Sequence, residues 1–402
     1  MAPFFANQSC DPWQLRERPC ELGNYVKYAV NATGPADVQR TIAFAASNNI
    51  QLVIRNTGHD YLGRSAGAGS PAVWTHHLKE ITHIPTYKDV DYRGPAFDVG
   101  AGVQRFEIMA AARDKGLVVV GGECPTLAEM LVNANKRENP DLYWALTGGG
   151  GSTYGVMVAV TVKAHKDAVF GGASLSFFTT DNAQDVFYDA IQAFHEELPA
   201  MLDAGTMVVN YFTTSFFMIS PLNAYNKTAA EVKSILAPVV ARLDAKNINY
   251  TASYSKFNTY YEHYDKYFGP LPLGNIQVGI AQYGGRLIPR NVIGNITDTW
   301  KAVVEKGVTW IGVGTNVQRL GAAPWSEAIE TQQKMTNVIT PLVEAATPGS
   351  GTYVNEADFN QKDWQTTFRG SNYNKLLGIK RKWDLSCIFY ATVGIEVSIV
   401  AC

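Results

Sequence analysis

The chain has 402 residues, of which 46% are apolar and only 17% are charged. This length and composition exclude a disordered chain, and they suit two domains or one large domain wrapped around a smaller one. The formal net charge is −2 and no long run of Lys or Arg occurs, which argues against a nucleic-acid partner. Because no apolar stretch approaches the roughly 20 residues of a membrane helix, we expect no membrane partner.

The first third of the chain alternates helix-like and strand-like patterns. Apolar residues recur at helical spacing over 36–48, with Pro35 at a first-turn position where its missing N–H costs nothing. A second helix is predicted over 105–115, closed by Gly116. Apolar or alternating runs predict strands at 52–54, 97–99, 117–120 and 156–162. This alternation favours an α/β or α+β domain, which we place at residues 1–169.

The pattern changes after about residue 170. Aromatic strand-like runs such as 207–212 are separated by long amphipathic helices, among them one over 232–243 that Pro238 should kink. We therefore expect residues 170–345 to form a second domain, with helices covering one face of an antiparallel sheet. Residues 346–402 are expected to return to the first domain.

The most informative stretch runs from Leu52 to Ser70, where a strand leads directly into a loop rich in glycine and hydroxyl residues. Backbone N–H groups in such a loop can turn inward around an anion such as a pyrophosphate. His59 lies in the middle of the loop, and a second glycine-rich turn follows at Gly148–Gly151. Taken alone, the loop is equally compatible with a surface turn beside a structural histidine.

Several motifs in order resemble the fungal FAD-linked oxidases of the berberine bridge type, within the wider family that has a vanillyl-alcohol-oxidase-like FAD domain. The resemblance implies an α+β fold, with a PCMH-type FAD-binding domain and a substrate domain of antiparallel sheet covered by helices. It also implies an oxygen-dependent oxidoreductase of secondary metabolism, in which a substrate C–H delivers a hydride to FAD and O₂ becomes H₂O₂. The motifs are Phe4–Pro12, Arg55–Ser65, Trp74–Lys79, Gly121–Thr126, Asp141–Gly155, Tyr353–Asp358 and Gly370–Tyr373.

By that resemblance, His59 matches the histidine that is joined to the 8α-methyl of FAD. Cys124 matches the position of a second, 6-S-cysteinyl link in some members, the alternative being a buried thiol. Asp60 either orients the imidazole or is a solvated turn residue. The implied cofactor-binding set is Arg55, Asn56, Thr57, Gly58, His59, Asp60, Ser65, Cys124, Gly149, Gly150, Gly155 and Asn372.

The general base stays open. Some relatives use a glutamate on a substrate-domain strand, but the corresponding stretch 308–316 contains no acid. The remaining candidates are Tyr353, Glu356 and Tyr373, and a tyrosine base would need a lowered pKa. Tyr373 is equally compatible with an ordinary half-buried tyrosine. His76 and His77 are expected to be structural, and no metal-ligand cluster is predicted.

The chain also departs from the family pattern. Family members place a sizeable segment, holding a glycine-rich stretch and a strand that touch FAD, between the positions of Thr126 and Asp141, and residues 394–402 differ from the family's ending. Two hypotheses follow: an FAD-dependent oxidase, or a truncated, flavin-poor and non-catalytic relative. A third, an NADPH-dependent flavin reductase, is disfavoured because such proteins lack the linking histidine.

Other features are typical of secreted proteins. Cys10 and Cys20 are close together in the sequence and suit a short disulfide loop. The chain also contains Asn-X-Ser/Thr sequons for N-glycosylation. The alternative is that some sequons arise by chance and that both cysteines are free thiols. The N-terminus lacks the basic start and apolar core of a signal peptide. We expect a secreted-type glycoprotein monomer whose partners are a small organic substrate and O₂. Its sequons begin at Asn7, Asn31, Asn226, Asn249 and Asn295.

Overall fold

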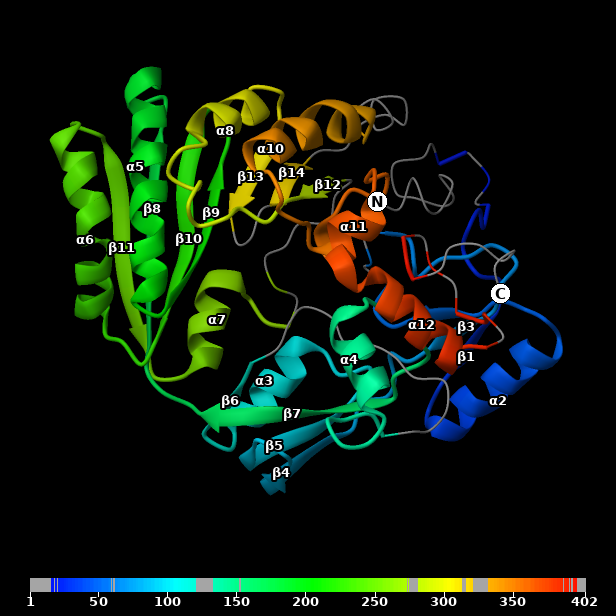
Figure 1. The fold of residues 1–402 in the computed structure, drawn as a ribbon. Coiled ribbons are helices and arrows are strands. Elements are labelled where there is room, and N and C mark those ends of the chain that lie inside the picture. The colour runs from blue at the N-terminus through cyan, green and yellow to red at the C-terminus, as the bar shows by residue number, and fades with distance from the viewer. Residues whose placement is uncertain are drawn as a thin grey trace. The chain divides into compact units, whose positions relative to one another are not determined.

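Figure 1 shows a computed structural model of the chain, which divides into two compact units. Unit 1 comprises Met1–Lys166 and Gln361–Cys402, and unit 2 comprises Asp167–Asn360. The structure describes residues 16–17, 19, 21–58, 60, 62–120, 133–151, 153–272, 274, 281–312, 316–320, 332–385, 387–389, 391 and 393–395.

Unit 1 contains a small parallel sheet with strand order β1-β3-β2. Helix α2 lies between β1 and β2 along the chain and buries Val38, Ile42 and Ala45, the face that the helical periodicity predicts. The bounds of these elements are β1 (Ala29–Asn31), α2 (Pro35–Ser47), β2 (Val53–Arg55) and β3 (Ala72–Trp74).

A second sheet of unit 1 is antiparallel, with strand order β4-β5-β7-β6. Helix α3 packs on β6, and Phe97, Val99 and Ala112 form the buried layer beside it. A capping box fixes the start of α3, because Gln104 and Glu107 exchange side-chain and backbone hydrogen bonds. The bounds are β4 (Ile81–Lys88), β5 (Arg93–Gly100), α3 (Arg105–Arg113), β6 (Leu117–Val119) and β7 (Ala159–Lys166).

The C-terminal return of the chain is fastened to the start of β2. Lys380 and Asp384 form an ion pair in which each residue is only 1% exposed. Asp384 accepts hydrogen bonds from the amides of Ile388 (3.0 Å) and Phe389 (3.2 Å), and Lys380 Nζ donates to Phe389 O at 2.8 Å. The amide of Leu52 then donates to Ile388 O at 3.1 Å. Residues 388–389 are thereby bound to the strand that enters the glycine-rich loop.

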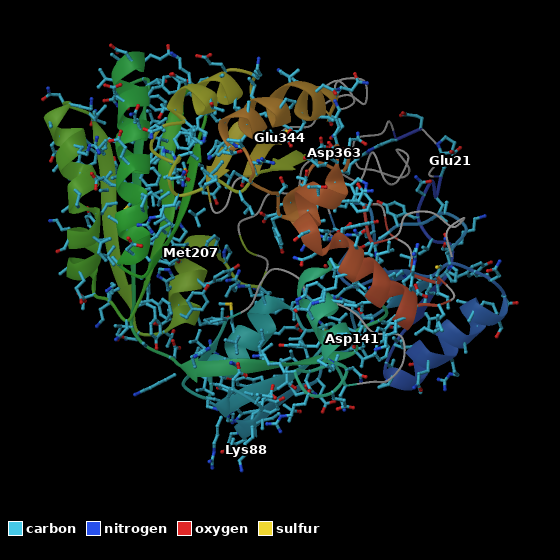
Figure 2. The ribbon with its side chains drawn as sticks, in the orientation of Figure 1. Glu21, Lys88, Asp141, Met207, Glu344 and Asp363 are labelled. Atoms are coloured by element: carbon cyan, nitrogen blue, oxygen red, sulfur yellow. The ribbon has the colours of Figure 1, made fainter. Side chains whose placement is uncertain are left out.

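The return segment also packs through helices. Helices α11 (Trp364–Arg369) and α12 (Tyr373–Trp383) are joined by the short η3 (Gly370–Asn372), and α12 packs against α4 (Pro140–Gly148). At the surface of this contact Lys382 Nζ donates to Asp141 Oδ2 at 2.6 Å. Asp141, on α4, is labelled in Figure 2.

Unit 2 is built on a seven-stranded sheet whose described pairings are all antiparallel, in the order β11-β8-β10-β9-β13-β14-β12. Helices α5, α6, α8 and α10 supply the large core on one face, with Phe187, Phe194, Leu236 and Trp300 fully buried. The strand bounds are β8 (Phe170–Phe178), β9 (Thr206–Phe212), β10 (Phe216–Tyr225), β11 (Tyr250–Phe257), β12 (Ala281–Gly285), β13 (Thr309–Gly312) and β14 (Asn316–Leu320).

A pair of glycines lets helices approach both faces of β8. A Cβ on Gly171 would lie 2.5 Å from Val232 of α6, whereas a Cβ on Gly172 would lie 2.8 Å from His263 of α7. Successive strand residues point to opposite faces, so α6 and α7 lie on opposite sides of the sheet. The helix bounds are α5 (Gln184–Asp203), α6 (Ala229–Ala245), α7 (Tyr260–Phe268), α8 (Thr297–Val304), η1 (Met335–Ile339), α10 (Thr340–Ala346) and η2 (Val354–Glu356).

The α+β class and the helix-covered antiparallel sheet are confirmed. The expectation that helices cover only one face is wrong, because Gly172 of β8 admits α7 to the face opposite α6. Helix α6 continues through Pro238. Unit 2 extends to Asn360, whereas the sequence placed the end of the second domain at residue 345. The reason is local: η2 contacts β12, and the buried Asp358 accepts hydrogen bonds from Gln332 and Thr336. The return to unit 1 therefore begins at Gln361.

Within the described ranges, none of the helices combines the length and apolar character needed to cross a bilayer. The His, Cys, Asp and Glu side chains of the same residues form no group of three that could hold a metal ion.

Candidate cofactor site

The glycine-rich loop after β2 is closed upon itself by Arg55. Its Nη1 donates to Ser65 O at 3.2 Å, which joins the two ends of the loop. Gly58 adopts a φ of +85°, and a Cβ at this position would lie 2.4 Å from Arg55 Nη2. Only glycine fits between the guanidinium and the turn without a shift of one of them. The loop backbone therefore runs directly over a half-buried positive charge.

Asn56 holds the loop against the second sheet and leaves one buried acceptor unused. Its side-chain Nδ2 donates to Ala101 O at 2.6 Å, and its backbone carbonyl accepts a hydrogen bond from Trp74 Nε1 at 2.9 Å. Its Oδ1 is buried and has no hydrogen-bond partner among the described residues. A buried polar atom without a partner is costly in a finished protein, and it is common where a ligand completes the site.

Asp60 is committed to the loop itself. Its Oδ2 accepts from the amides of Leu62 (3.0 Å) and Arg64 (2.7 Å), while its Oδ1 pairs with Arg64 Nε (2.8 Å) and Nη2 (2.5 Å). The side chains of Asp60 and Arg64 are 14% and 9% exposed. Asp60 is therefore a largely buried carboxylate that shapes residues 60–64, and the alternative of a solvated turn residue is wrong.

The second glycine-rich turn follows α4 and meets the return segment. A Cβ on Gly149 would lie 2.6 Å from the ring of Tyr154, and a Cβ on Gly150 would lie 2.7 Å from Arg369 Nη2. Gly150 adopts a φ of +88°. Tyr154 is fully buried, with its hydroxyl directed to Leu376 O at 3.4 Å, and burial raises its pKa. This phenol is therefore a neutral packing group and not a base.

Arg369 is the most unusual charge of this region. It is 6% exposed, its Nε has no hydrogen-bond partner among the described residues, and burial lowers its pKa to about 10. The neighbouring Arg64 lowers that pKa further, whereas Tyr154 and Tyr373 raise it. Even so, the guanidinium stays charged at neutral pH. The sequence did not predict roles for Arg369, Arg64 or Tyr154, because no residue pattern indicates that an arginine in a polar stretch is buried.

The remaining cofactor residues lie around the same loops. Thr57 and Asn372 are exposed, and Gly155 is buried with a φ of 151°. His59 and Cys124, the two proposed flavin attachment points, lie outside the described residues.

The three candidates for the general base are divided between the units. Tyr373 begins α12 in unit 1, is half-buried, and meets Trp364 edge to face with ring centroids 5.5 Å apart. Tyr353 and Glu356 lie in unit 2. Tyr353 is 49% exposed and accepts a hydrogen bond from Asn355 at 2.8 Å. Glu356 ends η2.

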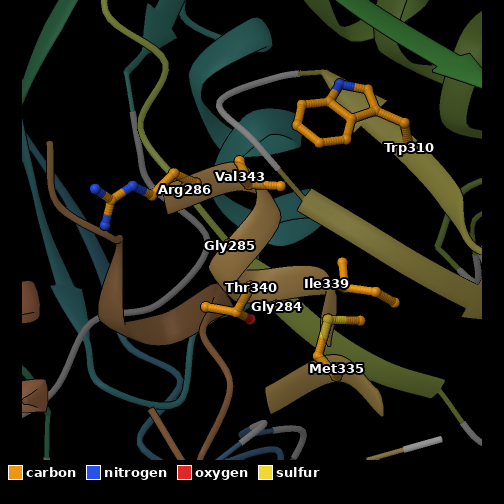
Figure 3. A pocket seen from close by; sticks show the side chains of 8 residues that line it. All are labelled: Gly284, Gly285, Arg286, Trp310, Met335, Ile339, Thr340 and Val343. Atoms are coloured by element: carbon orange, nitrogen blue, oxygen red, sulfur yellow. The ribbon is translucent and has the colours of Figure 1, made fainter. Parts of the chain in front are cut away.

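A pocket lies inside unit 2, between β12, β13 and the helices above them. Figure 3 shows Trp310, Met335, Ile339 and Val343 side by side, with the guanidinium of Arg286 pointing away from them. The space is about 280 Å³, including the part open to solvent. The lining is mainly apolar, with Arg286 and Thr340 as its polar members.

The residues present fit FAD. Gly58, Gly149 and Gly150 let backbone and guanidinium groups approach where any Cβ would clash. Asn56 Oδ1 and Arg369 Nε are buried and have no partner in the described part of the chain. A dinucleotide offers both donors for the former and anionic oxygens for the latter.

Comparison with known proteins decides the family. A family model for an FAD binding domain matches residues 26–127, and one described as berberine and berberine like matches residues 352–396. The FAD-linked oxidoreductase ZEB1 of Gibberella zeae is 49% identical over 455 residues, which covers 98% of this chain and 80% of that protein. The chain belongs to the FAD-linked oxidoreductases of the berberine bridge enzyme-like, VAO-type family.

Solved structures agree with this assignment. The VAO-type flavoprotein MtVAO615 from Myceliophthora thermophila C1 matches this chain with a TM-score of 0.89 and 31% identity. The match covers 98% of this chain and 83% of MtVAO615. A glucooligosaccharide oxidase from Acremonium strictum, described with a 6-S-cysteinyl, 8α-N1-histidyl FAD, shares the fold alone. Its TM-score is 0.69 at 15% identity, over 93% of this chain and 92% of that chain. The predicted family, fold and enzyme class are confirmed.

Proposed function

We propose that this FAD-linked oxidoreductase is an oxidase of a small organic substrate and carries FAD covalently on His59. The observation that carries the proposal is the cradle of unit 1, in which two glycine-rich turns meet buried, incompletely partnered polar groups. The chemistry that FAD supplies when bound is the acceptance of a hydride from a substrate C–H, with O₂ as final acceptor and H₂O₂ as product.

The described neighbours of His59 support its role. Gly58 is pressed against the Arg55 guanidinium, and Asp60 is held by Arg64 and two amides. The backbone on either side of position 59, at Gly58 and Asp60, is thus held by defined contacts. A covalent link needs such preorganisation, because the reacting nitrogen must meet one particular carbon.

The substrate base that we favour is Tyr373. Of the three candidates it alone lies in the unit that holds the cradle, and it interacts electrostatically with the Arg369 guanidinium. Its half-buried phenol at the start of α12 supplies an oxygen that could accept the substrate proton. Tyr373→Phe is expected to lower kcat by about a hundredfold or more with little change in flavin content. Unchanged kcat would return the role to Tyr353 or Glu356.

Acid precipitation tests the covalent link. The wild-type pellet is expected to stay yellow, whereas His59→Ala should release its flavin on denaturation. Peptide mapping should find FAD on His59, and Cys124→Ala should change the flavin absorption spectrum if Cys124 carries the second link. Flavin that is fully extractable from the wild-type chain would refute attachment at His59.

A truncated, flavin-poor relative is the second candidate, and two observations favour it. The alignment with ZEB1 is 455 positions long, and this chain contributes 98% of its 402 residues to it, which is about 394. About 60 positions of the alignment therefore have no counterpart in this chain. The FAD-domain match ends at residue 127, where the sequence indicates a missing segment. Each buried group left unpartnered by such a loss costs about 1–3 kcal/mol, against a net domain stability of about 5–15 kcal/mol.

Flavin stoichiometry separates the two candidates. The truncated form is expected to hold FAD substoichiometrically and to produce little H₂O₂. Insertion of the corresponding ZEB1 segment after Thr126 should raise both, while the same number of Gly and Ser residues at that point serves as the control. Full occupancy and steady H₂O₂ production by the 402-residue chain would show that the shortened loop closes the site.

We also propose that the protein is a secreted-type glycoprotein and a monomer. The four described sequon asparagines, Asn31, Asn226, Asn249 and Asn295, are exposed. Cys387 is disulfide-bonded, and each of the other four cysteines lies outside the described residues. The pairing of Cys10 with Cys20 therefore stays a prediction, which peptide mapping under non-reducing conditions tests directly. Size-exclusion chromatography with light scattering tests the monomer.

A further inference from the structure

Strand β11 forms an open edge of the unit 2 sheet. It stands at one end of the strand order and pairs with β8 (Figure 1). Among the described residues no other strand pairs with it, and none of the backbone hydrogen bonds of turns and loops involves Tyr250–Phe257. A strand at the end of a sheet presents its outward N–H and C=O groups for pairing with another chain.

This edge is longer and less protected than the other described sheet edges. β11 has eight residues, no proline and one charged side chain, Lys256, and its register with β8 is continuous. The other eight-residue edge, β4, contains Pro85 and a register shift between Ile84 and Tyr87. The remaining edges, β1, β2, β6 and β12, have three to five residues. Proline, register shifts, several charges or shortness normally prevent edge pairing, and β11 has none of them.

The sequence of β11 suits pairing with a second copy of itself. Antiparallel pairing about a two-fold axis perpendicular to the sheet keeps the helix-covered faces of both copies on the same side. A register centred on Ser253 places Ala252 opposite Tyr254 of the second copy. Lys256 then lies opposite Tyr250, so like charges do not face each other across the pair.

A sequon begins at the residue before this strand. Asn249 is exposed, and Thr251 is the second residue of β11. The backbone of Asn249 is held by Asn182, whose Oδ1 accepts from Asn249 N at 2.7 Å and whose Nδ2 donates to Asn249 O at 3.1 Å. A sugar attached to the exposed Asn249 side chain would therefore start from a fixed point at the end of the open edge.

We propose that an N-linked glycan on Asn249 covers the open edge of β11 and keeps the protein monomeric, and that the bare edge pairs with β11 of a second copy. A bulky, hydrated oligosaccharide at this point excludes a second backbone from the spacing of about 4.8 Å that strand pairing requires. The glycan rests on the proposed secreted glycoprotein, whereas the open edge does not.

The modification needs a lipid-linked oligosaccharide pyrophosphate as donor. The bond between the first sugar carbon, C1, and the pyrophosphate oxygen breaks, and a bond from C1 to Asn249 Nδ2 forms. One amide proton is released, and the lipid pyrophosphate is the leaving group.

The test uses the full chain secreted by a eukaryotic host. Glycopeptide mapping should find a glycan on Asn249, and light scattering after size-exclusion chromatography should find a monomer. Asn249→Gln and Thr251→Ala both abolish the sequon, so the apparent mass of each variant should rise up to twofold with concentration. Thr251→Ser keeps the sequon and should keep both the glycan and the monomer. Asn295→Gln is the matched control, because it removes a sequon that lies before α8 and outside the strands, and it should stay monomeric.

A further pair of changes tests whether the dimer forms through β11. Ser253→Lys is added to Asn249→Gln, so that the new lysines of the two copies lie opposite or diagonal to each other in any register centred near the middle of the strand. This change should restore the monomer. Ser253→Ala in the same background also removes the 2.7 Å hydrogen bond between Ser253 and Ser174 but adds no charge, and it should stay dimeric.

The outcomes separate this inference from the proposed function. Glycans on other sequons with a bare Asn249 overturn the inference and leave the secreted glycoprotein in place. A parent without any glycan overturns both. An occupied Asn249 whose loss leaves a monomer overturns the covering role, and so does an occupied parent that is dimeric. A dimer of Asn249→Gln that Ser253→Lys leaves intact overturns pairing through β11.

Discussion

The buried pair of Lys380 and Asp384 offers the sharpest test of how the return segment is held. In Asp384→Asn the ammonium of Lys380, 1% exposed, loses its carboxylate and keeps its hydrogen bond to Phe389 O. Removal of one member of a buried ion pair costs about 3–5 kcal/mol, because the other charge stays buried and loses the attraction that offset its loss of water. Much of the net stability of a domain would be lost.

The expected shift follows from the size of unit 1. For a domain of about 200 residues, 1 kcal/mol corresponds to about 2–4 °C, so the melting temperature of unit 1 should fall by roughly 6–20 °C. Hydrogen exchange should locate the effect. The amide of Leu52, which donates to Ile388, should lose protection together with that of Phe389.

Two controls separate charge from packing. Lys382→Met removes a surface pair with Asp141, whose partners are 61% and 31% exposed, and should cost at most about 1 kcal/mol. The double variant Lys380→Met with Asp384→Leu removes both buried charges and should recover most of the loss. The reasoning fails if Asp384→Asn is no worse than Lys382→Met, or if the double variant is as unstable as the single one.

Three further predictions concern other parts of the chain. Burial lowers the pKa of His195 from 6.5 to about 3, so the unfolded chain binds a proton that the folded chain does not, and stability is lost as the pH falls below about 6.5. Urea titrations at pH 7 and pH 5 give the free energy of unfolding at each pH, and His195→Leu should reduce the loss between them by about 2 kcal/mol. If the variant loses as much stability as the parent, the imidazole is not buried in its neutral form. Gly58→Ala should lower both flavin content and the melting temperature of unit 1, by about 1–2 kcal/mol of left-handed strain plus the contact with Arg55. In material secreted by a eukaryotic host, glycosidase treatment with mass spectrometry should find glycans on exposed sequons, and their complete absence would count against secretion; the described sites are Asn31, Asn226, Asn249 and Asn295.

Local patterns predicted most of the elements and the first cofactor loop. Periodicity located α2 and α6, and the glycines around His59 indicated an anion-binding loop. These features depend on residues close together in the chain, so spacing and side-chain type are enough to detect them.

The rest depends on contacts between distant residues. Nothing near Arg369 in the chain indicates burial, because the groups around it come from Gly150 and Arg64, more than 200 positions away. The same holds for residues 346–360, which were expected to leave the second domain but join unit 2 through the hydrogen bond from Gln332 to Asp358. Single-sequence patterns carry no information on such pairings.

The hydrogen bond from Leu52 to Ile388 bears on when the cofactor loop can form during synthesis. Its two residues are 336 positions apart. At about 5–20 residues per second, translation takes roughly 17–70 s to cover that distance. Over this interval β2 has been made but its C-terminal partner has not. The start of β2 therefore gains this partner only after residue 388 has been made, and we expect flavin attachment to follow that point in synthesis.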